Sequence, residues 1–297
     1  MQNSLKKIGI FTSGKNDWNV QQLEEEIKKK GIACVSFPLS ELVARLAGRP
    51  RVSCRGHDLE EFDALIVRWV PKGSAEQLIF RMDALHRIEN LGVRVMNPPI
   101  AIERCADKFY TNSLLEDAGI PTVPTVVAEK HNEAMKAFEE FKDIIVKPLF
   151  GSLGAGMFRI NDRDLAYRTF LALEFGRYVY YIQKFIPHQN WDIRAFVIGN
   201  DVFAAVRRGE SWKTNVSAGA KVEPYTLDEE LKEIALKSAK ILNCDYAGVD
   251  IIKNEDVFYV VEVNAIPGWK GLQSVTEVNI AKKIIDRLLE DLTSRSP

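Results

Sequence analysis

Two apolar segments near the end of the chain each carry an acidic residue where an apolar one would be expected. Asp250 lies within the segment 247–252, and Glu262 and Asn264 lie within the segment 259–266. Both segments have the composition of strands, in which side chains alternate between two faces, so Glu262 and Asn264 are predicted to share a face. Two carboxylates and an amide oxygen are ligands that Mg²⁺ accepts, usually together with nucleotide phosphates. The pattern therefore predicts a metal site beside a nucleotide, with ordinary edge-strand acids as the alternative.

A glycine-rich turn precedes these segments by about a hundred residues. It contains Gly151, Gly154 and Gly156, with Ser152 after the first glycine. Because glycine has no Cβ, backbone N–H groups in such a turn can approach phosphate oxygens closely. No Gly-Lys-Ser/Thr sequence follows, and the turn does not open a helix, so neither a Walker A loop nor a dinucleotide fingerprint is indicated. A phosphate-binding loop and an ordinary hairpin turn both remain open.

Lys147 ends the apolar strand that is expected at 143–147, just before a proline. A lysine at the end of a buried run is costly unless it meets an anion, and the glycine-rich turn that follows favours a phosphate. The alternative is a lysine whose stem is buried and whose ammonium group reaches solvent. Further on, a β-rich run ends at 183–186, and the backbone there can offer N–H and C=O groups to an adenine edge.

Charged residues recur on the next β-rich runs. Asp192 and Arg194 lie two positions apart and so share a strand face, and Arg207 and Arg208 precede the polar segment 212–215. A basic loop with an asparagine suits a phosphate or carboxylate substrate. A cross-strand ion pair and a solvated hairpin are the respective structural alternatives.

The elements that must position these residues fall into a parallel part and a mixed part. Strands are predicted at 7–11, 33–37, 64–68 and 93–96 with helices between them, which favours a parallel α/β layer. One helical stretch is predicted over 101–118. The remainder alternates helices with antiparallel hairpins, one of them signalled by the turn 199–201. We expect a fold that joins α/β and α+β parts, with domains at 1–97, 98–186 and 187–297.

Composition narrows the function classes. Lys and Arg number 40 against 41 Asp and Glu, a balance that favours neither a nucleic acid nor a membrane surface as partner. The four cysteines are far apart in sequence and form no C-x-x-C pair, which argues against a disulfide scaffold or zinc site and favours a cytoplasmic protein. The first residues lack the apolar run of a signal peptide.

Taken in order, these motifs resemble the ATP-grasp superfamily, and within it the glutamate ligases related to the enzyme that modifies a ribosomal protein. The resemblance covers about residues 8–292. It rests on the following segments: Asp107–Lys108, 146–148, 151–156, 183–186, 192–194, 213–215, 248–250 and 262–268.

The resemblance implies an ATP-grasp fold preceded by a parallel α/β pre-ATP-grasp domain. It also implies residue roles, which fall into three groups. Nucleotide contacts are implied for Lys108, Lys147, Gly151, Ser152, Gly154, Gly156, Gln183, Lys184, Phe185, Ile186, Asp192, Lys213, Thr214 and Asn215, with Asp192 holding the ribose. Two Mg²⁺ ions, with Mn²⁺ as a possible substitute, are implied at Asp250, Glu262 and Asn264. Catalytic roles are implied for Lys147, Arg194 and Arg208, with Arg207 as the competitor of Arg208.

The implied reaction is carboxylate activation by ATP. An acyl phosphate and ADP form first, and an amino acid, expected to be L-glutamate, then forms an amide through its amine. The segment 264–272 looks most like the branch that adds glutamate to tetrahydromethanopterin, and a flat pterin could stack on Trp269 or Trp212 unless these are core or rim residues. A protein C-terminus, a carrier protein and a non-catalytic ATP-binding role are the alternatives. A homo-oligomer is expected because relatives are often dimers or tetramers.

Overall fold

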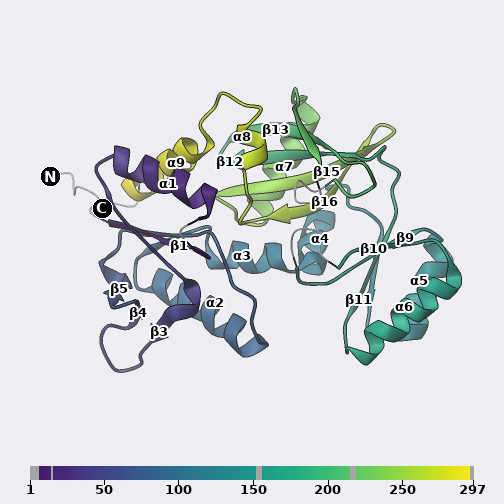
Figure 1. Ribbon diagram of the computed structural model, residues 1–297, viewed down its shortest axis with the longest axis horizontal. Coiled ribbons are helices and arrows are strands. Elements are labelled where there is room, and N and C mark those ends of the chain that lie inside the picture. Colours follow the sequence, from purple (N-terminus) through teal and green to yellow (C-terminus); the bar gives the residue numbers. More distant parts are fainter. Residues whose placement is uncertain (1–6, 15, 152–155, 215–218, 295–297) are drawn as a thin grey trace.

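The computed structural model describes residues 7–14, 16–151, 156–214 and 219–294 (Figure 1). It opens with a parallel sheet in the order β2-β1-β6-β7, which confirms the predicted α/β layer. The strands are β1 (Lys7–Phe11), β2 (Ala33–Phe37), β6 (Ala64–Val67) and β7 (Arg94–Met96). They alternate with helices α1 (Trp18–Lys29) and α2 (Ala75–Asn90). Side chains at both helix starts accept backbone N–H groups, Asp17 for α1 and Ser74 in a capping box for α2.

A small antiparallel sheet in the order β3-β4-β5, which the sequence did not predict, lies between β2 and β6 in the chain. Its strands, β3 (Leu42–Ala44), β4 (Val52–Cys54) and β5 (His57–Asp58), are flanked by the 3₁₀ helices η1 (Leu39–Glu41) and η2 (Leu59–Glu61). Strands of two or three residues are too short to show an alternating pattern.

The helical stretch predicted at 101–118 is two helices, so the prediction of one continuous helix was wrong. Helix α3 (Pro99–Ala106) ends and α4 (Lys108–Asp117) begins at Asp107, whose backbone is extended. The Asp107 carboxylate accepts hydrogen bonds from the N–H groups of Phe109 and Tyr110, at 2.9 and 3.0 Å. Aspartate competes with the helical backbone for those donors, and it therefore caps a new helix.

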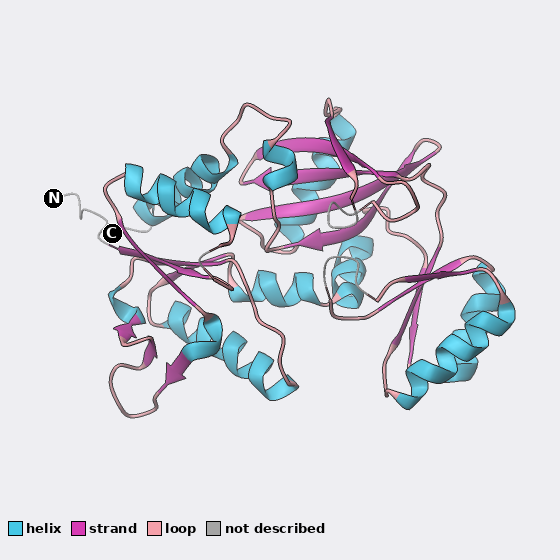
Figure 2. Ribbon diagram, in the orientation of Figure 1, coloured by secondary structure: helices cyan, strands magenta, loops and turns pink. Residues whose placement is uncertain are grey.

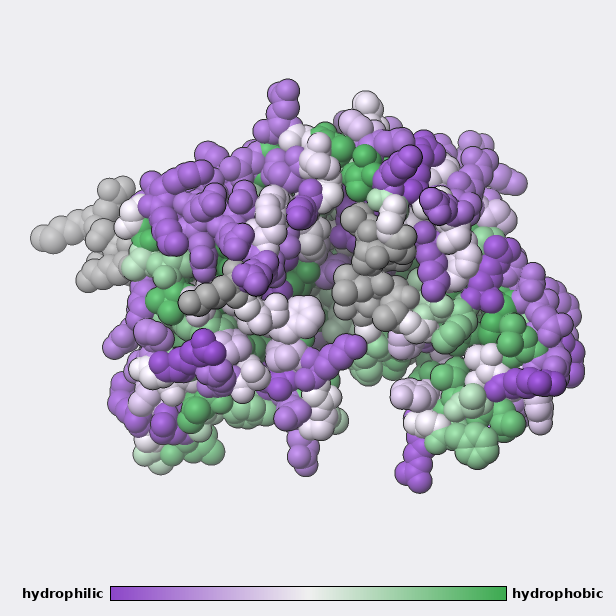
Figure 3. Space-filling model, in the orientation of Figure 1, coloured by the Kyte–Doolittle hydropathy of each residue, from purple (hydrophilic) through white to green (hydrophobic). Residues whose placement is uncertain are grey.

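The central part is an antiparallel sheet in the order β10-β9-β11-β8, covered by two helices (Figures 1 and 2). Its strands are β8 (Thr125–Ala128), β9 (Ile144–Lys147), β10 (Phe158–Ile160) and β11 (Tyr180–Lys184), and its helices are α5 (His131–Phe141) and α6 (Arg163–Phe175). Figure 3 shows hydrophobic side chains on the surface of this part. Its exposed aromatic residues include Phe158, Phe175 and Tyr178.

The last part is a five-stranded antiparallel sheet in the order β14-β13-β12-β15-β16. Its strands are β12 (Trp191–Ile198), β13 (Asp201–Arg208), β14 (Lys221–Pro224), β15 (Tyr246–Asn254) and β16 (Val257–Asn264). Helix α7 (Glu229–Ile241) packs on it, and α8 (Lys270–Gln273) and α9 (Ile280–Ser294) follow. Ile198 pairs with Asp201 across the predicted turn, where Gly199 has a φ of +56°.

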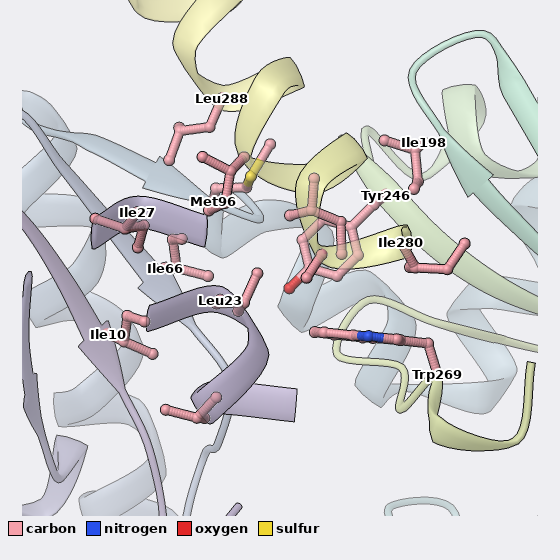
Figure 4. Close-up of a cluster of buried hydrophobic side chains, with 14 of the residues drawn as sticks. Ile10, Leu23, Ile27, Ile66, Met96, Ile198, Tyr246, Trp269, Ile280 and Leu288 are labelled. Carbon is pink, nitrogen blue, oxygen red and sulfur yellow. The ribbon is translucent and has the colours of Figure 1, made fainter. Parts of the chain in front are cut away.

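Helix α9 returns to the start of the chain and packs beside α1 (Figure 1). Figure 4 shows Ile280 and Leu288 of α9 in one apolar cluster with Leu23 and Ile27 of α1 and with Tyr246. The predicted first and third domains therefore share a hydrophobic core, which fixes the final sheet against the parallel one. No helix in the part of the chain that the structure describes is long and apolar enough to cross a membrane.

Polar contacts reinforce this junction at the ends of the β15–β16 hairpin. The buried Asn97 amide donates to the carbonyl oxygens of Tyr246 and Ala265, at 2.7 and 2.6 Å, and accepts the N–H of Asp245 at 2.6 Å. The buried Arg94 of β7 forms an ion pair with the Asp245 carboxylate. These bonds fix the start of β15 and the residue after β16, and so hold the hairpin that carries the predicted metal ligands.

Candidate nucleotide and metal site

The β15–β16 hairpin places the predicted metal ligands next to one another. Asp250 lies directly opposite Glu262, and Gly248 lies opposite Asn264. Beyond Asp250 the register shifts, so that Ile251 pairs with Val260. Val261 is therefore an extra residue in β16, a β-bulge.

The bulge decides which way the ligands face. Before it, Phe258 and Val260 are buried in the core beside α7, and after it the buried residue is Val263. Glu262 and Asn264 consequently lie on the opposite face of the sheet, together with Asp250. Without the extra residue, Glu262 would continue the face of Phe258 and Val260 and point into the core.

Two arginines hold Asp250. Arg194, its cross-strand partner on β12, forms a two-pronged ion pair in which Nη2 lies 2.9 Å from Oδ2. The Nη2 atom of Arg207 lies 3.1 Å from Asp250 Oδ1. Burial raises the pKa of Asp250, but Arg194 and Arg207 outweigh that effect and bring the pKa below its usual value.

Asp192 belongs to the same network. Arg207 lies opposite it and donates from Nε to Oδ1 at 2.7 Å, while the Thr214 hydroxyl donates to Oδ2 at 2.5 Å. Burial raises the pKa of Asp192 despite the charge of Arg207, and the nearby Asp250 raises it further. Both Asp192 oxygens thus already have protein partners, and the ribose contact stays a prediction.

Arg207 lies beside the carboxylates of Asp192 and Asp250, whereas Arg208 does not. The guanidinium of Arg208 lies on the other face of β13, where it forms a solvent-exposed ion pair with Glu223 at 2.8 Å. Neighbouring residues of a strand point to opposite faces, so only one of the two arginines can reach Asp250. The sequence expectation that favoured Arg208 is corrected in favour of its competitor.

The buried Lys147 and the half-buried Lys108 lie near the carboxylates. Lys147 donates to the Gln183 side-chain oxygen at 2.6 Å, and Gln183 in turn donates to the Thr125 hydroxyl at 3.2 Å. Burial lowers the pKa of Lys147 to about 8, and the charge of Lys108 adds to this effect against the attraction of Glu262. Lys147 therefore lacks a full counter-charge, as expected of a side chain that awaits an anion.

Lys108 is the first residue of α4, where the cap at Asp107 places it. Its ammonium group donates to the Gly151 carbonyl oxygen at 2.9 Å, so it reaches the start of the glycine-rich turn. Burial lowers its pKa, while Glu262 and Asp107 oppose the shift. The structure thus joins Lys108, Lys147 and Glu262 in one electrostatic unit.

Glu262 is the acid whose charge is least compensated. Burial and the neighbouring Asp250 raise its pKa, and Lys108 and Lys147 only partly oppose that rise. No hydrogen bond or ion pair within the described ranges engages its carboxylate. The amide oxygen of Asn264, which accepts the N–H of Ile266 at 2.9 Å, lies two residues on. A carboxylate without a partner beside a second carboxylate and an amide oxygen fits a divalent cation.

Backbone hydrogen bonds to other parts of the chain fix the segment 183–186, which was predicted to line the adenine pocket. The N–H groups of Lys184 and Phe185 donate to the carbonyl oxygens of Pro124 and Asp143, both at 2.9 Å. The Ile186 carbonyl oxygen lies 2.9 Å from Nδ1 of His188, whose Nε2 lies 3.0 Å from the carbonyl oxygen of Trp212. The sequence offered no signal for His188, a single histidine after a proline, which links this segment to the polar loop.

Some predicted contacts lie outside the described residues, namely Ser152, Gly154 and Asn215. Of the same turn, Gly151 and Gly156 have φ angles of +150° and +76°, which favour glycine. The Lys213 ammonium group lies 5.3 Å from the centre of the Trp212 ring.

Trp269 is a core residue and is not available to a pterin. Its side chain is 1% exposed and packs edge-on against Trp18 and Phe196, with the Arg68 guanidinium 4.7 Å from its ring centre. The stacking role that the sequence left open for Trp269 is therefore wrong, and its alternative, a core tryptophan, is confirmed.

Comparison with known proteins places this arrangement in a family. Residues 6–102 match the RimK PreATP-grasp domain, and residues 105–288 match the RimK-like ATP-grasp domain. This chain belongs to the RimK-like ATP-grasp family. The family confirms the predicted fold and the predicted class of enzyme, a ligase that forms amide bonds with ATP, and this fold implies a divalent metal with ATP.

Similar proteins have several acceptors. The chain is 40% identical to the tetrahydromethanopterin:alpha-L-glutamate ligase of Methanocaldococcus jannaschii, over 97% of this chain and all of that protein. It is 34% identical to the enzyme of that name from Methanococcus maripaludis, over 95% and 98% of the two chains. It is also 34% identical to the alpha-aminoadipate–LysW ligase LysX of Sulfurisphaera tokodaii, over 68% of this chain and 74% of that one.

Similarity to solved structures supports the fold and nothing further. The ATP-grasp ligase PsnB, complexed with a minimal precursor, Mg and ADP, superposes with a TM-score of 0.73 at 20% identity, over 97% of this chain and 98% of that one. A RimK domain ATP-grasp protein from Sphaerobacter thermophilus gives a TM-score of 0.73 at 19% identity, over 95% and 99%.

Proposed function

We propose that this protein joins the amine of L-glutamate to a carboxylate of tetrahydromethanopterin or a closely related pterin, with ATP as the source of energy. The observation that carries the proposal is the Glu262 carboxylate, which has no partner among the described residues, lies opposite Asp250 and is attracted by the half-buried Lys108 and the buried Lys147. Identity to named pterin ligases along nearly the whole chain supports the choice of acceptor.

The lysines bind the nucleotide phosphates in this proposal. Lys147 is buried and held by Gln183, so its ammonium group is oriented before ATP arrives. Lys108 contacts the Gly151 carbonyl oxygen and so couples phosphate binding to the glycine-rich turn. Asp250, Glu262 and Asn264 would hold two Mg²⁺ ions, or Mn²⁺ in their place, which when bound neutralise charge on the phosphates.

Arg194 is positioned for the reacting carboxylate. Its Nε and Nη2 atoms donate to Asp250. Its Nη1 atom lies beside Gly248, so closely that a Cβ added to Gly248 would be 2.7 Å from Nη1. Within the described ranges Nη1 has no hydrogen-bond partner, so it can donate to an acyl phosphate. Arg207 acts through Asp250 and Asp192, which it holds in place.

The bond changes follow from this arrangement. An oxygen of the pterin carboxylate attacks the γ-phosphorus of ATP in line, and the bond to the β-phosphate oxygen breaks to release ADP. The glutamate amine then attacks the acyl carbon, an amide bond forms, and phosphate leaves together with one proton from the nitrogen. The chain supplies charge and orientation, and no cysteine or serine nucleophile is required.

A second acceptor class is favoured by a specific observation, the similarity to LysX over two thirds of the chain. In that case the activated carboxylate would belong to a carrier protein. A non-catalytic role is less well supported, because Lys108, Lys147, Arg194, Arg207, Asp250 and Glu262 lie together at one site.

The test is an acceptor screen. The protein is mixed with ATP, Mg²⁺ and L-glutamate, and tetrahydromethanopterin is compared with a carrier protein and with a peptide. We expect ADP release that depends on the pterin, with a pterin mass gain of one glutamyl residue.

Turnover only with a protein acceptor would favour the second acceptor class. ATP binding without turnover on any acceptor would contradict the assignment as a ligase. The predicted homo-oligomer is tested separately, by light scattering during size-exclusion chromatography.

A further inference from the structure

Two free cysteines that are far apart in sequence lie side by side next to the candidate site. Cys105 is in the last turn of α3, and Cys244 lies two residues before the start of β15. Their sulfur atoms are 3.6 Å apart, and both residues are half-buried. A disulfide has an S–S distance of about 2.05 Å, so the sulfurs need to approach by only about 1.5 Å. The sequence could not show this pair, because a packing contact between helix and sheet brings it together.

The pair lies against the nucleotide and metal residues. Cys105 lines a narrow crevice together with Lys108 and Glu262, and the residue as a whole is half-buried. Cys244 begins the approach to β15, the strand of Asp250, and its N–H bonds to the Ala239 carbonyl oxygen at 2.9 Å. A bond between the two sulfurs would therefore join the helix before Lys108 to the strand of a metal ligand.

We propose that Cys105 and Cys244 are a site of reversible oxidation, at which a peroxide converts the two thiols into a disulfide that ties α3 to β15. The Cys105 sulfur attacks one peroxide oxygen and becomes a sulfenic acid, and the first water leaves. The Cys244 thiol then attacks that sulfur, the S–S bond forms, and the second water leaves. Two thiols and one hydrogen peroxide thus give one disulfide and two waters, and a thiol reductant reverses the change.

The disulfide has a consequence for the nucleotide. Cys105 lies three residues before Lys108, and the cap at Asp107 joins them through the α3–α4 junction. Movement of Cys105 toward Cys244 is transmitted through this junction to Lys108, and so it perturbs the 2.9 Å hydrogen bond from Lys108 to the Gly151 carbonyl oxygen. Loss of one charged contact weakens ATP binding roughly tenfold. This consequence rests on the proposed function, whereas the disulfide itself does not.

The remaining cysteines provide an internal control. Cys34 is half-buried in the parallel sheet, and the buried Cys54 thiol donates to the Pro38 carbonyl oxygen at 3.4 Å, so among the described residues neither has a second cysteine sulfur beside it. The reduced full-length protein is treated with equimolar hydrogen peroxide, and thiols are counted after denaturation. We expect the four thiols to fall to two, with one cross-linked peptide that contains positions 105 and 244 in a non-reducing digest.

Matched variants sharpen the result. Cys105→Ser and Cys244→Ser should give no intramolecular disulfide, while Cys34→Ser should still form the bond. Equal loss of all four thiols, disulfides between molecules, or sulfinic acid at Cys105 with Cys244 free would overturn the proposal.

ATP binding is then measured by calorimetry on the reduced, oxidised and re-reduced protein. We expect roughly tenfold weaker binding after oxidation, full recovery with a thiol reductant, and no change in peroxide-treated Cys244→Ser. Equal affinity before and after disulfide formation would overturn the link to Lys108. Absence of ATP binding in the reduced protein would contradict the proposed function and leave the thiol count as an independent result.

Discussion

Replacement of Glu262 by glutamine separates a functional carboxylate from a structural one. Glutamine keeps the shape of the side chain and removes its charge, in a bulged segment whose backbone does not change. If Glu262 holds a metal ion beside ATP, the variant loses turnover and becomes more stable. If Glu262 only supports the fold, the variant loses stability instead.

The direction of the stability change in Glu262→Gln follows from the electrostatic surroundings of Glu262. Burial and Asp250 raise the pKa of Glu262, so its ionised form costs folding free energy at neutral pH. That cost disappears as the pH falls through the raised pKa, where the carboxyl is protonated in the folded state. Glutamine never bears the charge, so the stability gain of the variant is largest at neutral pH and shrinks toward acid. Each 1 kcal/mol of gain raises Tm by about 2–4 °C for a chain of this size.

The functional loss is larger than the stability gain. Removal of a charged ligand from a metal and phosphate site costs at least about 2.7 kcal/mol in transition-state stabilisation, or a hundredfold in kcat/KM. ADP release and thermal unfolding are measured on the same preparations, without nucleotide for the unfolding. Glu255→Gln, the same change at an exposed position of the same hairpin, is the control and should leave both unchanged. Near-normal turnover, or a Tm several degrees lower, would refute the reasoning.

Other outcomes follow from the same network. Lys147→Ala should raise the apparent KM for ATP at least tenfold in ADP release assays, and an unchanged value would rule out the phosphate contact. Because burial lowers the pKa of Lys147 to about 8, the ATP affinity of the native protein should fall as the pH rises above about 8. Binding measured as a function of pH should show no such fall in Lys147→Arg, since arginine stays charged. Gly248→Ala should lower kcat more than it changes the KM for ATP, since the added Cβ would lie 2.7 Å from Arg194 Nη1; equal activity would mean that Arg194 need not lie there. Arg207→Met should cost about 3–5 kcal/mol of unfolding free energy, and Arg208→Met less than about 1, as denaturant titration can compare.

Local pattern alone was enough for the features that depend on neighbours in the chain. Apolar runs predicted β1 and β2 with the bounds that the structure has. The two-residue period of a strand put Glu262 and Asn264 on one face, because that period is set by the backbone. The order of the motifs identified the superfamily before any contact was known. Even the helix break at Asp107 has a local cause, an aspartate cap, although the apolar pattern around it continues.

Contacts between distant segments decided the rest. Whether Glu262 points outward depends on the extra residue at Val261, and a bulge is visible only once β16 is paired with β15. The choice between Arg207 and Arg208 depends on which of them lies opposite Asp192 across a hairpin. Register is a relation between two strands, and a single strand does not contain it.

The sequence by itself thus determined the chemical types of the site and their order along the chain: carboxylates on strands, a lysine at a strand end and a glycine-rich turn. The tertiary structure decided which of them meet. It buried Trp269, gave Lys147 the partner Gln183, and brought Cys105 to within 3.6 Å of Cys244. The physical reason is that side-chain periodicity is a local property of the backbone, whereas pairing, burial and charge compensation arise only when distant segments pack together.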